Sequence, residues 1–186
     1  MAHPSTLFRF SVDLSDVDRA VYESLDFRVP RHPSEDDGRM VVRVLARLIF
    51  HEEGLEFGRG LSTREDAALW THNLRGEVQR WIEVGAPSAE RLHRASKKAP
   101  SLHVVTAKGH ATLRAEWSKS AVHAADAVEI VHVPETLVAE CAALLGRQND
   151  WVVVLHEGLL SVTSGSQTAT GELQRESLEA FMAARA

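Results

Sequence analysis

The chain of 186 residues is 44% hydrophobic and 25% charged, and its formal net charge is −5. This length suffices for one well-buried core, so we predict a single domain over residues 1–186. The negative net charge excludes a general electrostatic attraction to nucleic acid, and such a partner would therefore require a local basic patch.

The single cysteine and the lengths of the apolar segments exclude several classes of protein. Cys141 is the only cysteine, which excludes an internal disulfide and a thiolate zinc cluster. No window approaches the roughly 20 apolar residues of a membrane-spanning helix. The first six residues also lack an apolar stretch of signal-peptide length. We therefore expect a cytoplasmic protein without a membrane partner.

The N-terminal region is predicted to contain two strands and a helix. Alternation of apolar and polar residues indicates an antiparallel pair of strands at 7–14 and around 24–29. A broad apolar face at a helical period, which includes Met40, Val44 and Ile49, then predicts a helix over 35–50. Ser34 precedes it as a candidate N-cap, and Gly54 follows it as a stop signal.

Three extended segments and a second helix come next. The segments are 55–61, 68–74 and 78–84, and the last two are joined by a turn at Arg75-Gly76. Pro87 and Ser88 begin a helix that runs to about residue 99, and 102–106 is a short apolar strand.

The second half continues to alternate helices and strands. Leu113, Trp117 and Ala121 indicate a helix, 128–133 a strand, and Pro134 the start of another helix. A hairpin with strands at 151–155 and 159–163 turns at Glu157-Gly158, and we predict a loop over 164–171. The pattern favours no single state after residue 172. The predicted class is α/β (α+β), with a mixed central sheet flanked by helices and a C-terminal hairpin.

One acid stands out because it lies in an apolar run. Glu83 follows Trp81 and Ile82 and precedes Val84. An unpaired buried carboxylate costs several kcal/mol, so Glu83 needs a partner. Asp66 precedes it with a helix on either side of the pair, and two such carboxylates can meet around a metal ion.

The order helix, three strands, helix, strand over 35–106 resembles the core of the PD-(D/E)XK (restriction-endonuclease-like) nuclease superfamily. Nearly the whole chain resembles the YaeQ family, which implies this fold with no established activity. Specific motifs carry the resemblance, and they are Arg31-His32-Pro33-Ser34-Glu35, Phe57-Gly58-Arg59-Gly60-Leu61, Trp70, Trp81-Ile82-Glu83-Val84-Gly85-Ala86-Pro87 and residues 91–95.

The superfamily resemblance implies a site for Mg²⁺ or Mn²⁺ that hydrolyses phosphodiesters. Asp66 and Glu83 match its metal ligands, Glu35 matches the acid of its first helix, and the carbonyl of Val84 could be a further ligand. The superfamily lysine is missing, because its position two residues after Glu83 is Gly85.

A basic residue from elsewhere could replace that lysine. Arg91, Arg94 and Lys98 form one stripe of the second predicted helix. Arg94 is the first candidate, Arg91 the second, and Lys108 a third. An arginine stabilises phosphate charge but does not accept a proton at neutral pH.

Structural roles compete with each catalytic one. Glu35 and Arg39, spaced i,i+4, could be an exposed ion pair that Arg43 and Arg47 extend. Glu65 could take the place of its neighbour Asp66.

Glu83 could be paired simply with Arg80, Arg91 or Arg94. An anion could dock at the start of the first helix, where the candidate residues are Arg31, His32, Ser34 and Arg39. His32 and Ser34 could equally form only a cap.

Two functions of different classes follow. The first is a metal-dependent phosphodiesterase acting on nucleic acid. The second is a nuclease-like protein without catalysis, which binds a nucleic-acid or protein partner through the same cleft. The retained acids favour the first, whereas the missing lysine and the negative charge favour the second.

Overall fold

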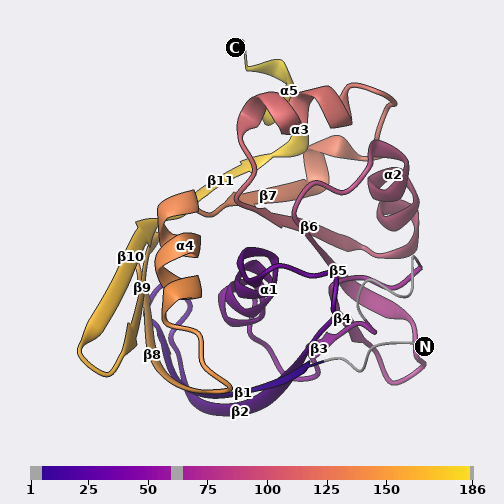
Figure 1. Cartoon of the computed structure of the whole chain (residues 1–186). Coiled ribbons are helices and arrows are strands. Elements are labelled where there is room, and N and C mark those ends of the chain that lie inside the picture. The colour runs from indigo at the N-terminus through magenta and orange to yellow at the C-terminus, as the bar shows by residue number, and fades with distance from the viewer. Residues whose placement is uncertain (1–5, 60–64, 185–186) are drawn as a thin grey trace.

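The computed structural model describes residues 6–59 and 65–184. Two β-sheets enclose a layer of helices, and further helices cover the far face of one sheet (Figure 1). This arrangement confirms the predicted α/β (α+β) class and adds a second sheet. No described helix is long and apolar enough to cross a membrane.

The first sheet combines N-terminal strands with strands from the second half of the chain. It has five strands in the order β10-β9-β8-β1-β2, with β1 (Thr6–Asp16) antiparallel to β2 (Val21–Arg31) and parallel to β8 (Gln148–His156). Hence the predicted N-terminal pair and C-terminal hairpin belong to one sheet. The remaining strands are β9 (Leu159–Ser164) and β10 (Gln167–Glu172).

The second sheet has six strands in the order β11-β7-β6-β5-β4-β3. Its centre is parallel, because β5 (Val78–Val84), β6 (Ser101–Thr106) and β7 (Val128–His132) are connected through helices. Antiparallel strands flank this centre, namely β3 (Glu56–Phe57), β4 (Leu69–His72) and β11 (Gln174–Ser177).

The helices divide the interior into two cores. Helices α1 (Asp37–Ile49) and α4 (Glu135–Ala143) contribute to the core between the sheets. The second core lies on the opposite face of the six-stranded sheet and is covered by α2 (Ala89–Lys98), α3 (His110–Trp117) and α5 (Leu178–Ala183). A short 3-10 helix, η2 (Ala125–Ala127), precedes β7. Trp81 packs in the second core and Ile82 in the first, as expected for neighbours on a central strand.

Several predicted boundaries were wrong. The first helix begins at Asp37 with Asp36 as its N-cap, because the Asp36 side chain accepts a hydrogen bond from the Arg39 amide. The loop predicted at 164–171 is mostly β10, since pairing with β9 satisfies the backbone of a segment with no strong strand signal.

The helix predicted to reach Ala121 ends at Trp117. Only Glu56 and Phe57 of the strand predicted at 55–61 pair as β3, and residues 60 and 61 lie outside the described residues.

Candidate functional site

Glu83 is buried at the end of β5, on the face that packs against α2. Its Oε1 accepts hydrogen bonds from Trp81 Nε1 and from Arg91 Nε, both at 2.6 Å. Burial raises the pKa of Glu83, and the opposing effects of Arg91, Trp81 and Arg39 do not cancel it. Glu83 therefore has the partner that its apolar sequence context predicts, and the partner is an arginine.

Arg91 also fixes the segment that carries Asp66. Its Nη2 donates to the Asp66 main-chain carbonyl at 2.5 Å. The Asp66 carboxylate is instead held by Arg59, with Nε 2.7 Å from Oδ2 and Nη2 3.2 Å from Oδ1. Hydrogen bonding from Arg59 lowers the pKa of Asp66 despite its burial. Asp66 and Glu83 are thus linked through Arg91.

Glu35 lies just before α1 and turns into the protein. Its Oε2 is 2.8 Å from Arg43 Nη2, and its Oε1 is 3.7 Å from Arg39 Nε. The side chains of Glu35 and Arg43 are only 2% and 3% exposed, so the predicted solvated ladder was wrong for this pair. Oε1 of Glu35 and Nε of both arginines are buried without a hydrogen-bond partner among the described residues.

Arg39 reaches from α1 to the end of β5. Its Nη1 donates to the Val84 carbonyl at 3.0 Å. Gly85 follows with a φ of +89°, and a Cβ at that position would lie 3.2 Å from Arg39 Nη1. A guanidinium therefore occupies the space into which a side chain at position 85 would begin to extend.

These contacts form one connected arginine–carboxylate cluster. In space it runs from Arg43 through Glu35 to Arg39, which bonds the Val84 carbonyl next to Glu83. From Glu83 it continues through Arg91 to the Asp66 carbonyl, and the Asp66 carboxylate pairs with Arg59. Four guanidinium groups face three carboxylates, so this cluster has a formal surplus of one positive charge even though the chain as a whole is negative.

A cavity of about 460 Å³ adjoins Arg39 at the carboxyl ends of β5 and β6. Val84, Ala107 and Val138 contribute to its mostly aliphatic wall. Lys108 supplies a second basic group, and Asp36 and Glu135 supply two acidic ones. In sheets with parallel strands this edge commonly binds ligands. Lys108, the third basic candidate from the sequence, therefore lines the same cavity as Arg39, although its spacing in the sequence did not predict this.

Other predicted residues lie elsewhere. Arg94 is exposed and, within the described residues, makes no hydrogen bond or ion pair with Glu83; it lines a separate hollow with His93 and Ser120. Of the two candidates on α2, Arg91 is therefore the one that contacts Glu83. Lys98 lies over the Trp81 ring, 5.9 Å from its centroid.

The predicted anion site at the start of α1 does not assemble. Arg31 pairs with Asp37, while His32 Nδ1 lies 2.6 Å from Ser34 Oγ. The helix N-terminus is already capped by the carboxylate of Asp36, which occupies the place of an external anion. Only Arg39 of the four candidates lines a cavity described here.

The arrangement does not fit a divalent cation as it stands. Hard cations need several oxygen ligands, but here guanidinium groups already bond Asp66, Glu83 and the Val84 carbonyl. Over residues 6–59 and 65–184, no group of three or more His, Cys, Asp or Glu side chains could hold a metal. Arginine side chains therefore bond the oxygen atoms that were predicted as metal ligands.

Two partners of the predicted acids were missed. Trp81 was predicted only as core, yet its spacing of two residues from Glu83 on one strand places both side chains on the same face. Arg59 had no comparable signal, because its pairing with Asp66 depends on a loop conformation. Arg43 was predicted to extend an exposed ion pair of Glu35, and the structure instead buries it against Glu35.

The amino-acid sequence is similar to known proteins of one family. A family model described as YaeQ protein matches residues 1–173. The uncharacterised YaeQ protein of Escherichia coli K12 is 33% identical over 106 residues, which cover 57% of this chain and 59% of that protein. The uncharacterised YaeQ protein of Salmonella typhi is 34% identical over 99 residues, covering 53% and 55%. The chain thus spans less than two thirds of the length of these relatives.

Solved structures extend the likeness to almost the whole fold. The crystal structure of YaeQ from Pseudomonas syringae has a TM-score of 0.84 and 35% identity, covering 94% of this chain and 97% of that one. That of YaeQ from Xanthomonas axonopodis pv. citri has a TM-score of 0.84 and 28% identity, covering 93% and 98%. With a matching arrangement of elements and a family model that spans most of its residues, this chain belongs to the YaeQ protein family.

Proposed function

We propose that the protein binds the phosphate backbone of a nucleic acid at Arg39 and Lys108, without hydrolysing it. The observation that carries this proposal is the position of Arg39. Its guanidinium is anchored on the Val84 carbonyl and lines the cavity that Lys108 shares. Arg39 and Lys108 suit a phosphodiester, because a guanidinium can bind two of its oxygens at once. Of the two acids that also line the cavity, Asp36 is already engaged as the N-cap of α1, and Glu135 lies at the start of α4.

Arg39 also connects this proposal with the resemblance to the PD-(D/E)XK superfamily. The order α1, β3, β4, β5, α2, β6 follows the order of that core. Arg39 Nη1 lies where a lysine at position 85 would begin to extend, so the positive charge is retained from another element. Arginine does not act as a general base, and the arginines on Asp66 and Glu83 compete with a metal. Both features favour binding over hydrolysis.

A metal-dependent phosphodiesterase is the second candidate. It is favoured by the retained acids Asp66 and Glu83, and it requires that a cation displace the guanidinium groups of Arg59 and Arg91 from them. Asp66 and Glu83 would then hold Mg²⁺ or Mn²⁺, which polarises a phosphate and lowers the pKa of a bound water. The two functions therefore differ in whether a cation displaces arginine.

Fluorescence anisotropy with labelled single- and double-stranded DNA and RNA tests binding. We expect salt-sensitive binding, and Arg39→Gln with Lys108→Gln should reduce the salt slope by about one to two units. Arg75→Gln, at the exposed turn after β4, is the matched control. Circular dichroism of each variant shows whether it is folded. The single variant Lys108→Gln tests binding without disturbing the bonds of Arg39. Absence of binding to every probe at low ionic strength would reject the proposal.

Calorimetric titration with Mn²⁺ and gel analysis of the same oligonucleotides decide between the two functions. We expect neither metal binding at millimolar Mn²⁺ nor cleavage. Cleavage that needs Mn²⁺ and is lost in Asp66→Asn would establish the phosphodiesterase instead.

A further inference from the structure

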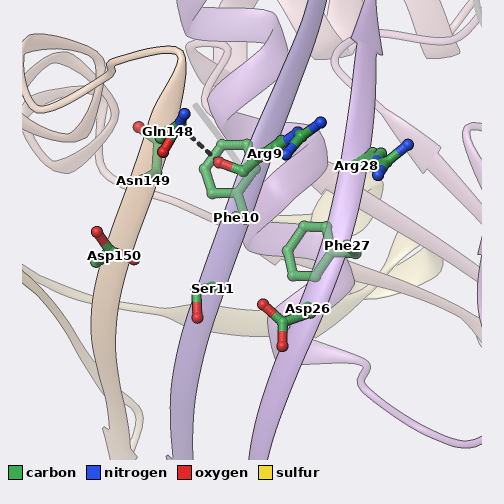
Figure 2. Close-up of a pocket in the computed structure, with 9 residues that line it drawn as sticks. All are labelled: Arg9, Phe10, Ser11, Asp26, Phe27, Arg28, Gln148, Asn149 and Asp150. Carbon is green, nitrogen blue, oxygen red and sulfur yellow. Dashed lines mark hydrogen bonds between the residues drawn. The ribbon is translucent and has the colours of Figure 1, made fainter.

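A hollow of about 430 Å³ lies on the outer face of the five-stranded sheet, away from the arginine–carboxylate cluster (Figure 2). The helices α1 and α4 pack in the core behind this sheet, so its outer face is uncovered in the described structure. The hollow lies over β8, β1 and β2, three adjacent strands.

Strand register sorts the charged residues of this hollow into two rows. One row runs Gln148, Arg9, Arg28 across the three strands. The next row on the same face runs Asp150, Ser11, Asp26. Two residues along a strand correspond to about 7 Å, so the backbone positions of the doubly positive row lie about 7 Å from those of the doubly negative row.

The hydrogen bonds of Asn149 fix this register. Its side-chain amide donates to the Arg9 carbonyl at 3.0 Å and to the Gly146 carbonyl at 2.9 Å (Figure 2). Its Oδ1 accepts from the Gly146 amide at 2.8 Å. Asn149 is 3% exposed, so the strand bearing Gln148 and Asp150 is held firmly beside β1.

The four charges remain without internal partners. Arg9 and Arg28 are directly opposed, and like charges in that position are destabilising. Within the described part of the chain, neither guanidinium forms an ion pair or hydrogen bond, and neither do the carboxylates of Asp26 and Asp150. Figure 2 shows both arginine side chains extending away from the acidic row.

Nearby charges on this sheet do find partners. Asp13 accepts a hydrogen bond from Ser24 at 2.6 Å, and Asp18 accepts from the amides of Glu157 and Gly158. The charged side chains of the two rows lack such contacts among the described residues. They would repel a uniformly charged ligand at one end, whereas a ligand with opposite charges at its two ends matches both.

We infer that this hollow binds a small zwitterion with well-separated charges. Its carboxylate lies between Arg9 and Arg28 within reach of the Gln148 amide, and its ammonium lies between Asp26 and Asp150. The connecting chain crosses Ser11. This inference is independent of the phosphate-binding function, because it uses different residues on a different sheet.

Titration with 6-aminohexanoate, followed by NMR of the backbone amides, tests the inference. Its two charges are separated by about the distance between the rows. We expect saturable shifts in β1, β2 and β8, and at least about tenfold weaker binding of hexanoate, hexylamine and glycine, since each lacks one charge or the spacing. Equal binding of the singly charged compounds would overturn the inference.

Paired substitutions assign the two ends. Arg9→Gln with Arg28→Gln should weaken 6-aminohexanoate at least about tenfold and abolish any hexanoate binding. Asp26→Asn with Asp150→Asn should do the same for 6-aminohexanoate and hexylamine. Both pairs should fold, because all four side chains are exposed and the arginine pair removes a like-charge repulsion between opposed residues.

Arg75→Gln and Asp126→Asn, exposed elsewhere, are matched controls and should bind as the unaltered protein does. Variants that bind 6-aminohexanoate normally would overturn the inference. So would sedimentation showing that the charged rows only join two copies of the chain, with no zwitterion bound.

Discussion

At the residue scale, Glu83 and Arg91 depend on each other unequally. The Glu83 side chain is 4% exposed, whereas that of Arg91 is 23% exposed and reaches water. Removing the arginine therefore leaves a carboxylate inside the protein, while neutralising the acid leaves a cation that can remain solvated. Because burial already raises the pKa of Glu83, its neutral form is the better tolerated one.

We predict that Arg91→Met destabilises the protein by about 3 kcal/mol or more at neutral pH. The loss should become smaller on acidification, because Glu83 is then protonated and no longer needs a counter-ion. A group whose pKa is raised in the folded protein stabilises the native state at low pH, and this stabilisation disappears as the pH rises through the folded pKa.

Urea unfolding at two pH values measures the effect. Addition of Glu83→Gln should recover most of the loss. A loss that does not change with pH, or is not rescued, would contradict the role of Arg91 as the counter-ion.

Gly85 is restricted by both its backbone and its neighbour. Its φ of +89° disfavours any L side chain, and a Cβ would approach Arg39 Nη1 to 3.2 Å. We predict that Gly85→Ala costs about 1–2 kcal/mol in urea unfolding. For the same reason, Gly85→Lys should not create hydrolytic activity. Gly109→Ala, with no atom within 4 Å of the added Cβ, is a control for which we expect a smaller loss.

At the element scale, Glu129 ties three strands of the second sheet together. From β7 its carboxylate bonds His103 Nδ1 of β6 at 2.7 Å and Arg175 Nη1 of β11 at 2.9 Å. Partial burial opposes ionisation, but these two partners outweigh it and lower the pKa of Glu129 from 4.5 to about 2. This edge of the sheet is therefore stabilised by an ionised acid.

We predict an acid-dependent loss of stability from this residue. Because the folded pKa is depressed, the contribution is present above pH 4.5 and disappears as the pH falls toward about 2. Glu129→Gln should lower stability at pH 6 and approach the unaltered protein at pH 2.5. Chemical unfolding at both values measures this, and an equal difference at both would contradict the prediction. Glu135→Gln, on α4 at an exposed helix start, is the control.

At the scale of the whole molecule, α1 belongs to the core that both sheets share. Nine of its thirteen residues are buried, and that core also contains residues of β1, β8, β5 and β6. Neither sheet can bury its inner face without this layer. Loss of packing in α1 should therefore weaken both sheets together.

Leu45→Ala tests this coupling, since Leu45 is fully buried in the shared core. We predict a loss of about 2–5 kcal/mol. Hydrogen exchange measured by mass spectrometry should show equal loss of protection in β8 and β6, because both open in one cooperative unit. Loss confined to one sheet would show that the chain divides into separately folding parts.

How far the site was predictable varies by residue. Glu83 was identifiable because an ionised group in an apolar context needs a partner, whereas Asp66 lies in a polar segment and was named from the superfamily resemblance. Which arginine serves each acid was not identifiable, since Arg91 and Arg94 share one helix stripe and differ only in their direction toward β5. Arg39 was predicted as an anion-binding residue or as an exposed partner of Glu35, because its reach to the Val84 carbonyl depends on how α1 packs against β5.

The sequence by itself determined most of the order of helices and strands as far as the hairpin at 151–163, the two faces of β5 and the need to neutralise Glu83. These follow from periodicity and from the cost of burying charge, which act over a few residues. Tertiary structure alone decided that the N-terminal strands pair with strands after residue 147, that arginines bond the oxygen atoms predicted as metal ligands, and that Arg9 and Arg28 face each other. Those outcomes depend on strand register and on contacts between residues distant in the chain, which local patterns do not encode.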